Sequence, residues 1–105
     1  MIVIFEKDYL RELYEKGKAS DKKHLFQPQI VSKYTRTIDL MKKLSNVMCL
    51  AQYGGLHYEA LHGDKEGLSS VKVNDQYRIE FREIIKGDKT IAEVVSITEL
   101  SKHYK

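Results

Sequence analysis

Histidine, tyrosine and basic residues are concentrated in the second half of the chain, and they are the residue types that metal-free RNA cleavage needs. That reaction requires one group to take the proton of the ribose 2′-hydroxyl and another to protonate the leaving 5′-oxygen. Fixed cations must also stabilise the charge on the phosphate. The candidate catalytic residues are His57, His62, Arg78, His103 and Tyr104, and the candidate RNA- or phosphate-binding cations are Lys65, Lys72 and Arg82.

Each of these residues also has an ordinary structural explanation. Histidines such as His57 and His62 are often simply solvated on a strand surface, and a loop lysine such as Lys65 is by default a solvated charge. His103 and Tyr104 lie near a chain end, where disorder is common. No single residue therefore indicates the chemistry, whereas the set of them does, because histidine serves as acid or base near neutral pH.

The sequence contains no pattern typical of metal, nucleotide or serine-nucleophile chemistry. His57 and His62 are five residues apart on an expected strand, which places them on opposite faces and argues against a metal pair. Gly63 and Gly67 bound a hairpin loop and do not form a phosphate-binding loop. Cys49 is the only cysteine, which excludes a disulfide within the chain. We therefore expect neither a metal nor a cofactor.

Two hairpins must position the candidate residues, and the second of them can be registered by counting. A three-residue turn at residues 74–76 pairs Val71 with Ile79 and Val73 with Tyr77, so that apolar residues face apolar residues. A two-residue turn would mix the two faces. The alternation therefore predicts a half-buried antiparallel pair of strands.

The same register gathers positive charge on the other face of these strands. It sets Lys72 directly opposite Arg78, where like charges repel, and it places Arg82 further along. Such a face can hold a bound anion. The alternative is a solvated face on which Glu80 neutralises the cluster, and the pattern alone favours this alternative because charged strand faces are usually just solvated.

The first half of the chain predicts one strand and two helices. Residues 1–5 form a short β-branched run that is typical of a strand. Asp8 is placed to cap a first helix that ends at Gly17. A second helix begins at Pro28 and is broken by residues 52–55. Its core-facing stripe is expected to contain Ile30, Tyr34, Ile38 and Met41, with Ser45 and Met48 continuing the same spacing.

Length and composition predict a globular protein with a single domain spanning residues 1–105. The net charge of +3 permits a nucleic-acid partner without demanding one. No segment approaches a membrane span or a signal peptide, so we expect a cytoplasmic protein with no membrane partner. The element order predicts an α/β (α+β) fold, in which two N-terminal helices pack on a twisted, mostly antiparallel sheet of four to five strands. Residues 90–98 are expected to form an interior strand of that sheet.

Residues 61–67 and 70–81 resemble the toxins of the RelE/ParE superfamily, in the HigB-like or plasmid maintenance killer branch. The matching segments read Leu-His-Gly-Asp-Lys-Glu-Gly and Ser-Val-Lys-Val-Asn-Asp-Gln-Tyr-Arg-Ile-Glu-Phe, and the resemblance covers about residues 56–104. It implies a RelE-like microbial RNase fold and a type II toxin that cleaves mRNA, usually on the ribosome, without a metal. It also implies a cognate antitoxin, HigA-like, that binds and silences the toxin.

The resemblance is incomplete at the residues that would move protons. The loop lysine of the family falls at His62, and a family histidine falls at Glu59, with His57 two positions before it. The closing Asp-Tyr-His of the family is not reproduced; residues 99–101 or 102–104 take its place. The resemblance places the family's arginine at Arg78. We expect phosphate binding by Lys72, Arg78 and Lys65 and an acid or base role for His103 or His57, supported by His62 and Tyr104.

Two other functions stay open at this point. A ParE-type poison would bind DNA gyrase and would have no nuclease site, and the histidine-rich rim weakly favours a nuclease instead. A catalytically degenerate toxin would persist only as an antitoxin-binding module, which the missing Asp-Tyr-His ending supports.

Overall fold

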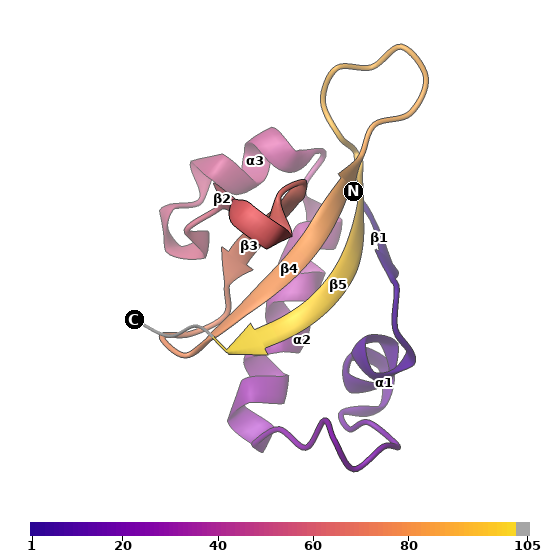
Figure 1. Ribbon diagram of the computed structural model, residues 1–105, viewed down its shortest axis with the longest axis vertical. Coiled ribbons are helices and arrows are strands. Elements are labelled where there is room, and N and C mark those ends of the chain that lie inside the picture. Colours follow the sequence, from indigo (N-terminus) through magenta and orange to yellow (C-terminus); the bar gives the residue numbers. More distant parts are fainter. Residues whose placement is uncertain (103–105) are drawn as a thin grey trace.

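The computed structural model describes residues 1–102 and shows a twisted sheet with helices on one face (Figure 1). The strands are β1 (Ile2–Phe5), β2 (Glu59–Ala60), β3 (Leu68–Lys72), β4 (Tyr77–Ile84) and β5 (Val94–Lys102). The helices are α1 (Asp8–Lys16), α2 (Pro28–Lys43) and α3 (Val47–Gln52), with two short 3₁₀ turns, η1 (Gly54–Leu56) and η2 (Gly63–Lys65).

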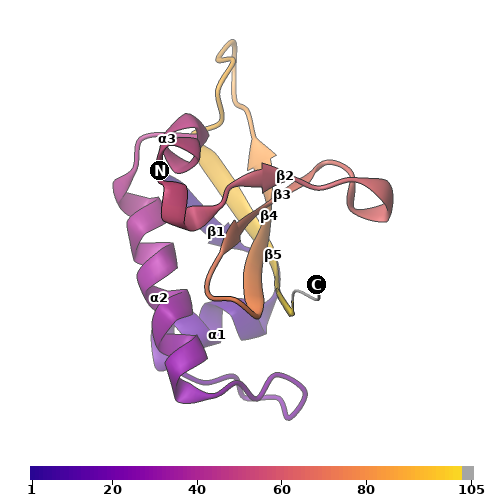
Figure 2. The ribbon, with the colours of Figure 1, turned by 90° about the vertical axis from the view of Figure 1, so that its left-hand side faces the viewer.

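The sheet has five strands in the order β1-β5-β4-β3-β2. β1 runs parallel to β5 at one edge, and the other three pairs are antiparallel. Seen edge-on, α2 and α3 lie on one side of the sheet and η2 projects from the other side, which we call the open face (Figure 2). The predicted fold class, with helices on a mostly antiparallel sheet of four to five strands, is confirmed.

The predicted hairpin register is also confirmed. Val71 pairs with Ile79 and Lys72 pairs with Arg78. Asn74 fixes the turn, because its side-chain oxygen accepts hydrogen bonds from the backbone N–H groups of Gln76 at 2.9 Å and Tyr77 at 2.8 Å. A short polar side chain that bonds to its own backbone favours a tight turn. The turn therefore sets which side chains reach the open face.

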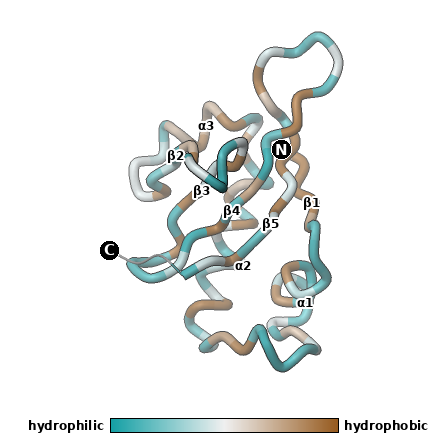
Figure 3. Tube along the Cα trace, viewed as in Figure 1, coloured by the Kyte–Doolittle hydropathy of each residue, from teal (hydrophilic) through white to brown (hydrophobic). Residues whose placement is uncertain are grey.

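The core lies between the helices and the inner face of the sheet. The α2 stripe of Ile30, Tyr34, Ile38 and Met41 is buried as predicted. The Tyr34 hydroxyl donates to the carbonyl oxygen of Leu10 at 2.8 Å, which satisfies its one polar atom inside the core and ties α2 to α1. The residues of β1 beside this core are hydrophobic, whereas those of the connection between α1 and α2 are largely hydrophilic (Figure 3). The sheet contributes Val71, Ile79, Phe81, Val95, Ile97 and Leu100.

The long second helix of the sequence prediction is wrong beyond Lys43. Asn46 ends the run and begins α3, since its side chain accepts the backbone N–H of Met48 at 2.9 Å. Asparagine competes with helical hydrogen bonds in this way and favours a cap over a helix interior. Met48 is consequently 55% exposed and does not continue the core stripe, and Ser45 is exposed as well.

Of the two predicted ends of the first helix, the C-terminal end is correct and the N-terminal cap is wrong. Gly17 does end α1: it has φ +79° and its N–H donates to the carbonyl of Leu13 at 3.1 Å. Asp8 is not the cap, because Lys7 occupies that position and makes no side-chain capping bond. Asp8 is the first helical residue, where a negative charge complements the helix dipole.

Two strand boundaries also differ from the prediction. β5 begins at Val94 and not at residue 90, and it continues to Lys102. Ile91 is 40% exposed in the preceding loop. The strand expected around His57 is only Glu59–Ala60, so His57 and His62 lie outside it. Among residues 1–102, none of the helices is both long and apolar enough to cross a membrane.

Replacing Asn46 by alanine tests the break between α2 and α3. We expect Asn46→Ala to lower the free energy of unfolding by about 1 kcal/mol, because the Met48 N–H loses its capping oxygen. Chemical denaturation followed by circular dichroism measures the change. Ser45→Ala, at the exposed neighbouring position, is the matched control, and equal losses in the two variants would contradict the capping role.

Candidate active site

The open face brings together the cations that the sequence singled out. Alternation along β3 and β4 places Lys72, Arg78 and Arg82 on the same face of the sheet, and Lys72 lies opposite Arg78. Lys65 reaches the same face from η2 and contacts Glu80 of β4. The predicted set of four cations is therefore gathered on one surface.

Arg78 is the most firmly held of these cations. Its side chain is only 12% exposed, and its Nε donates to Ser70 Oγ at 2.9 Å. Its Nη2 donates to the backbone carbonyl of His57 at 2.7 Å and lies 3.2 Å from Glu59 Oε1. Partners from β2, from β3 and from the residue after η1 thus fix the plane of the guanidinium before any ligand arrives.

The backbone of His57 is adapted to this contact. With φ +46°, it is the one non-glycine residue of the described chain in the left-handed region. That conformation costs an L-residue about 1–2 kcal/mol. Backbone strain of this kind is retained where the surroundings demand it, often at functional sites. Here it aims the His57 carbonyl at Arg78.

Lys65 and Glu80 form a second anchored pair on the open face. Lys65 Nζ lies 2.7 Å from Glu80 Oε2, and Ser101 Oγ donates to the same oxygen at 2.7 Å. Glu80 is only 6% exposed, so its charge depends on these partners. The hydrogen bond with Glu80 raises the pKa of Lys65 above its ordinary value. The pair ties the η2 loop to the middle of the sheet.

Two more cations of the open face are paired with carboxylates. Arg82 Nε lies 3.1 Å from Glu6 Oε2, and Ser96 Oγ donates to that oxygen at 2.9 Å. Lys72 Nζ lies 3.0 Å from Asp75 Oδ1. Asp75 and Glu59 therefore offset the repulsion predicted between Lys72 and Arg78.

The charges of the open face balance pair by pair. Adding Lys7, which lies 3.2 Å from Glu99, each of five cations has its own carboxylate. The solvated alternative supposed that Glu80 neutralises the whole cluster, whereas Glu80 pairs with Lys65 alone among these five cations. The site consequently holds its cations in place without presenting net positive charge. The pairs are Lys7–Glu99, Lys65–Glu80, Lys72–Asp75, Arg78–Glu59 and Arg82–Glu6.

The predicted histidines and the tyrosine are not all brought to this face. His57 lies next to Arg78 through its backbone, as described above. His62 instead lines a groove of about 380 Å³ with Ser69 and Glu83, which alternation places on the opposite side of the sheet from Lys72. His103 and Tyr104 lie outside the described residues.

The expectation that His57 and His62 point to opposite faces of one strand is wrong, since neither residue belongs to β2. Within residues 1–102, no cluster of three or more histidine, cysteine, aspartate or glutamate side chains is arranged to hold a metal ion.

The groove beside His62 contains a carboxylate held by hydroxyl groups. Glu83 accepts hydrogen bonds from the Tyr58 hydroxyl and from Ser69 Oγ, the latter at 2.6 Å. Burial, and then the hydrogen bond to Glu83, raise the pKa of Tyr58. Tyr58 is therefore a neutral donor that packs beside Phe81, and it is not a free base at neutral pH.

Sequence reasoning missed a histidine that the fold connects to the open face. His24 Nδ1 lies 3.0 Å from both carboxylate oxygens of Asp21, and its ring stacks on Tyr9 with centroids 3.5 Å apart. The Tyr9 hydroxyl donates to Glu99 at 2.5 Å and accepts the N–H of Leu100 at 3.2 Å. The short spacing of Asp21 and His24 was the available signal, whereas their contact with Tyr9 depends on tertiary packing.

Glu99 stays ionised in this cluster. Burial would raise its pKa, but the hydrogen bonds from Tyr9 and Lys7 outweigh burial and hold the pKa below its ordinary value. The carboxylate therefore joins α1 to β5 at the margin of the open face.

The second such residue is Glu59, which sequence reasoning noted as a departure from a family pattern without assigning it a role. Its side chain is 54% exposed and lies directly against the anchored guanidinium of Arg78. A carboxylate beside a fixed cation can take a proton from a hydroxyl whose neighbouring phosphate the cation binds. The arrangement thus has the parts of an acid–base site for a phosphodiester.

Comparison with known proteins supports both the fold and a family. A family model described as "RelE-like toxin of type II toxin-antitoxin system HigB" matches residues 3–95. No curated protein matches the chain. A solved "YoeB/ParE toxin from Agrobacterium tumefaciens" is 18% identical, with a TM-score of 0.57 over 99% of this chain and 100% of its own. A chain of the "YoeB-YefM complex from Staphylococcus aureus" is 14% identical, with a TM-score of 0.55 over 99% and 98%. At these identities the two structures establish the fold.

The pairing of Lys65 with Glu80 can be measured by titration. We expect Glu80→Gln to lower the pKa of Lys65 toward its ordinary value, because the hydrogen bond that Lys65 donates to Glu80 is the main cause of the raised pKa. A raised lysine pKa stabilises the fold below the ordinary lysine pKa, and this stabilisation is lost as pH rises through the raised value. NMR of the Lys65 side chain measures the pKa. Glu66→Gln, in the same loop, is the control and should leave it unchanged.

Proposed function

Because the chain belongs to the family of RelE-like toxins of the type II toxin–antitoxin system HigB, we propose that it is a metal-independent endoribonuclease that cleaves mRNA on the ribosome. Cleavage would inhibit translation in the cytoplasm, and a HigA-like form of the family's antitoxin partner would silence it. The observation that carries this proposal is the anchored guanidinium of Arg78 with the exposed carboxylate of Glu59 beside it.

The proposed reaction uses the substrate's own hydroxyl as nucleophile. Glu59 takes the proton of the ribose 2′-hydroxyl, and the 2′-oxygen forms a bond to phosphorus while the bond from phosphorus to the 5′-oxygen breaks. A histidine gives a proton to the leaving 5′-oxygen. Arg78 stabilises the additional negative charge on the phosphoryl oxygens. The products are a 2′,3′-cyclic phosphate and a 5′-hydroxyl.

The proton donor in this proposal is a histidine at the edge of the face. His57 is favoured among the described histidines because its own backbone contacts Arg78. His103 is the alternative donor from the sequence, and His62 and Tyr104 have supporting roles.

The remaining cations have a separate role, which is to hold the phosphates on either side of the cleaved bond. Lys72, Arg82 and Lys65 share the face with Arg78 and are suited to this. Each of them is bound to a carboxylate in the free protein.

Incoming phosphates must therefore displace carboxylates of the protein itself. Exposed ion pairs such as Lys72–Asp75 and Arg82–Glu6 contribute only about 0–1 kcal/mol, so displacement is feasible there, but it reduces the affinity of the face for RNA in free solution. A substrate that the ribosome already holds in place compensates for that loss. This competition supports a ribosome-dependent activity.

Substitution of Arg78 tests the proposed function as a whole. We expect Arg78→Ala to lower the cleavage rate by about 10²–10³-fold and to abolish growth arrest on induction, because the charged phosphate loses its main stabilising group. Mapping of mRNA ends after induction measures cleavage, and circular dichroism and antitoxin binding verify the fold. Arg11→Ala, which removes an arginine from an ion-paired position on α1, should remain fully toxic.

Full toxicity of Arg78→Ala would overturn the proposed site. Growth arrest by the unsubstituted chain with DNA damage and intact mRNA would instead indicate a gyrase poison. Absence of any growth arrest would indicate a degenerate toxin that only binds its antitoxin.

A pair of matched substitutions separates a base from a counterion. Glu59→Gln and Glu6→Gln each release an arginine of the open face from its carboxylate, but only Glu59 is the proposed base. We expect Glu59→Gln to lower the cleavage rate by about 10²–10⁴-fold and Glu6→Gln to keep or raise it. Single-turnover cleavage of ribosome-bound mRNA as a function of pH measures both. If the Glu59→Gln enzyme cleaves at the wild-type rate with an unchanged pH profile, Glu59 is only a counterion.

A further inference from the structure

Glu83 of β4 is a half-buried carboxylate that forms no ion pair with any lysine, arginine or histidine in residues 1–102. Every other glutamate on the five strands pairs with a lysine or an arginine. These are Glu59, Glu80 and Glu99. A charge that is partly removed from water requires compensation by hydrogen bonds where no countercharge is present. Glu83 is therefore the carboxylate of the sheet whose environment is suited to an additional hydrogen-bond donor.

Two hydroxyl groups fix the orientation of this carboxylate. The Tyr58 hydroxyl and Ser69 Oγ both donate to Glu83 Oε2, the latter at 2.6 Å. Two donors use both lone pairs of that oxygen. Within the described chain, Oε1 accepts no hydrogen bond. The carboxylate thus has one oxygen that can accept hydrogen bonds from a ligand in the groove that Glu83 lines.

This groove has the size and the lining that a flat heterocyclic ligand requires. Its volume of about 380 Å³ lies within the range of roughly 300–1,000 Å³ that is usual for small-molecule sites. Tyr58 and His62 line it with rings on which a planar group can stack, and Leu61 and Leu68 add apolar surface. Stacking surface beside a fixed polar group is the combination that binds a nucleobase.

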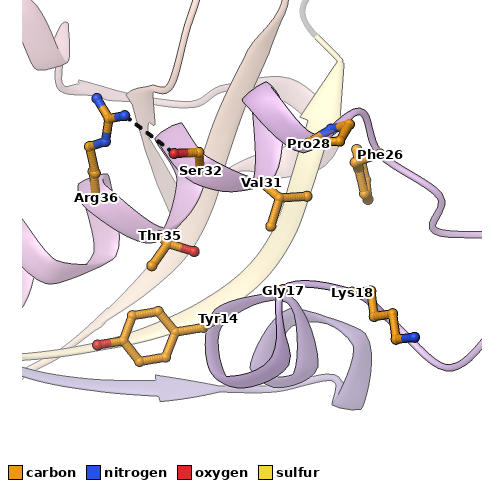
Figure 4. Close-up of a pocket in the computed structure, with 9 residues that line it drawn as sticks. All are labelled: Tyr14, Gly17, Lys18, Phe26, Pro28, Val31, Ser32, Thr35 and Arg36. Carbon is orange, nitrogen blue, oxygen red and sulfur yellow. Dashed lines mark hydrogen bonds between the residues drawn. The ribbon is translucent and has the colours of Figure 1, made fainter.

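The larger groove between α1 and α2, of about 600 Å³, lacks an acceptor of this kind (Figure 4). Tyr14, Val31 and Thr35 face the space between the helices. Arg36 extends outward over α2, where its Nη2 donates to Ser32 Oγ at 3.3 Å. None of the described residues that line this groove carries a carboxylate. The amino group of a base would find no charged acceptor there, so the groove beside Glu83 is the better site.

The groove beside Glu83 also adjoins the candidate active site across the edge of the sheet. Glu59 contacts Arg78 on the open face, and Tyr58, the residue before it, bonds to Glu83 on the opposite side. β2 is an outer strand of only two residues, and Figure 2 views the sheet from this edge. An RNA strand with a phosphate at Arg78 has to pass only this short edge to place a neighbouring base in the groove.

We propose that the groove lined by Tyr58, His62, Ser69 and Glu83 binds a guanine base, with Glu83 as the acceptor. The Watson–Crick edge of guanine presents N1–H and the N2 amino group side by side, and a carboxylate only accepts. Adenine and cytosine present an acceptor beside their amino group, and uracil flanks its N–H with two carbonyl oxygens. Each of these bases would place an acceptor against Glu83. That the guanine belongs to mRNA rests on the proposed function, whereas binding of guanine does not.

Titration of the purified protein with nucleoside 5′-monophosphates, followed by NMR at the amides of Gly67 and Ser69, tests the groove. We expect guanosine monophosphate to bind about tenfold more tightly than uridine monophosphate, because only guanine donates two hydrogen bonds to the carboxylate. Inosine monophosphate lacks only the N2 amino group and should have an intermediate affinity. All three ligands carry the same phosphate, so the comparison isolates the base.

Matched substitutions identify the group that recognises guanine. We expect Glu83→Gln to weaken binding of guanosine monophosphate about tenfold, because the amide replaces a charged acceptor. Glu66→Gln removes the same charge from the rim of the same groove and should weaken it less than about threefold. His62→Ala leaves the carboxylate intact and should weaken all three nucleotides by a similar factor, because it removes only a stacking surface. Thermal unfolding verifies that each variant folds.

Equal affinity for the three nucleotides, or equal losses in Glu83→Gln and Glu66→Gln, would overturn the guanine site. Tighter binding of N-acetylarginine amide than of guanosine monophosphate would overturn it as well and would assign Glu83 to a cationic side chain of a protein partner. Binding of guanosine monophosphate by Arg78→Ala separates the two proposals, because it should be unchanged whether or not the open face cleaves mRNA. If the chain cleaves mRNA, the mapped ends should share a guanine at one fixed position near the cut. Its absence would overturn the site.

Discussion

Arg78 is a charged group that the fold removes largely from water, and much of the architecture of the open face follows from the need to compensate its charge. A guanidinium that is 12% exposed requires partners for its donors, since an unpaired buried charge costs several kcal/mol. Ser70 supplies one from the adjacent strand, and Glu59 supplies a countercharge from β2. The third partner, the His57 carbonyl, is available only because the chain accepts a left-handed residue after η1. One buried cation thereby determines the path of the segment between α3 and β3.

The same requirement explains why the open face is neutral. Strands that gather lysine and arginine on one face repel one another unless carboxylates intervene. Glu80 and Glu6 intervene in the free protein, and each is itself held by a serine hydroxyl of β5. The serines fix the carboxylates, and the carboxylates fix the cations. Stability of the empty face and affinity for phosphate are therefore in competition, and the structure favours the stability of the empty face.

Sequence reasoning succeeded where a short-range rule decides the outcome. The turn at Asn74 and the alternation beside it specify the register of β3 and β4, because a slip of one residue would turn Arg78 toward the apolar core and Ile79 toward the open face. The α2 stripe followed from helical spacing. The break at Asn46 was missed because a cap and a continuing helix share the same apolar pattern around it. The pairing of Glu59 with Arg78 was missed for another reason: ion pairs between distant segments leave no periodicity in the sequence.

The pairing of charges on the open face has a physical consequence for how an anion would approach it. Long-range attraction depends on net charge within about a Debye length, so a face on which five cations pair with five carboxylates contributes little to it. Under the proposed function, selectivity would then arise from geometry, because only an RNA strand brought close to Arg78 by other contacts would compete with the carboxylates of Lys72 and Arg82. A face with net positive charge would instead attract any RNA strand in solution, and the paired carboxylates would prevent that.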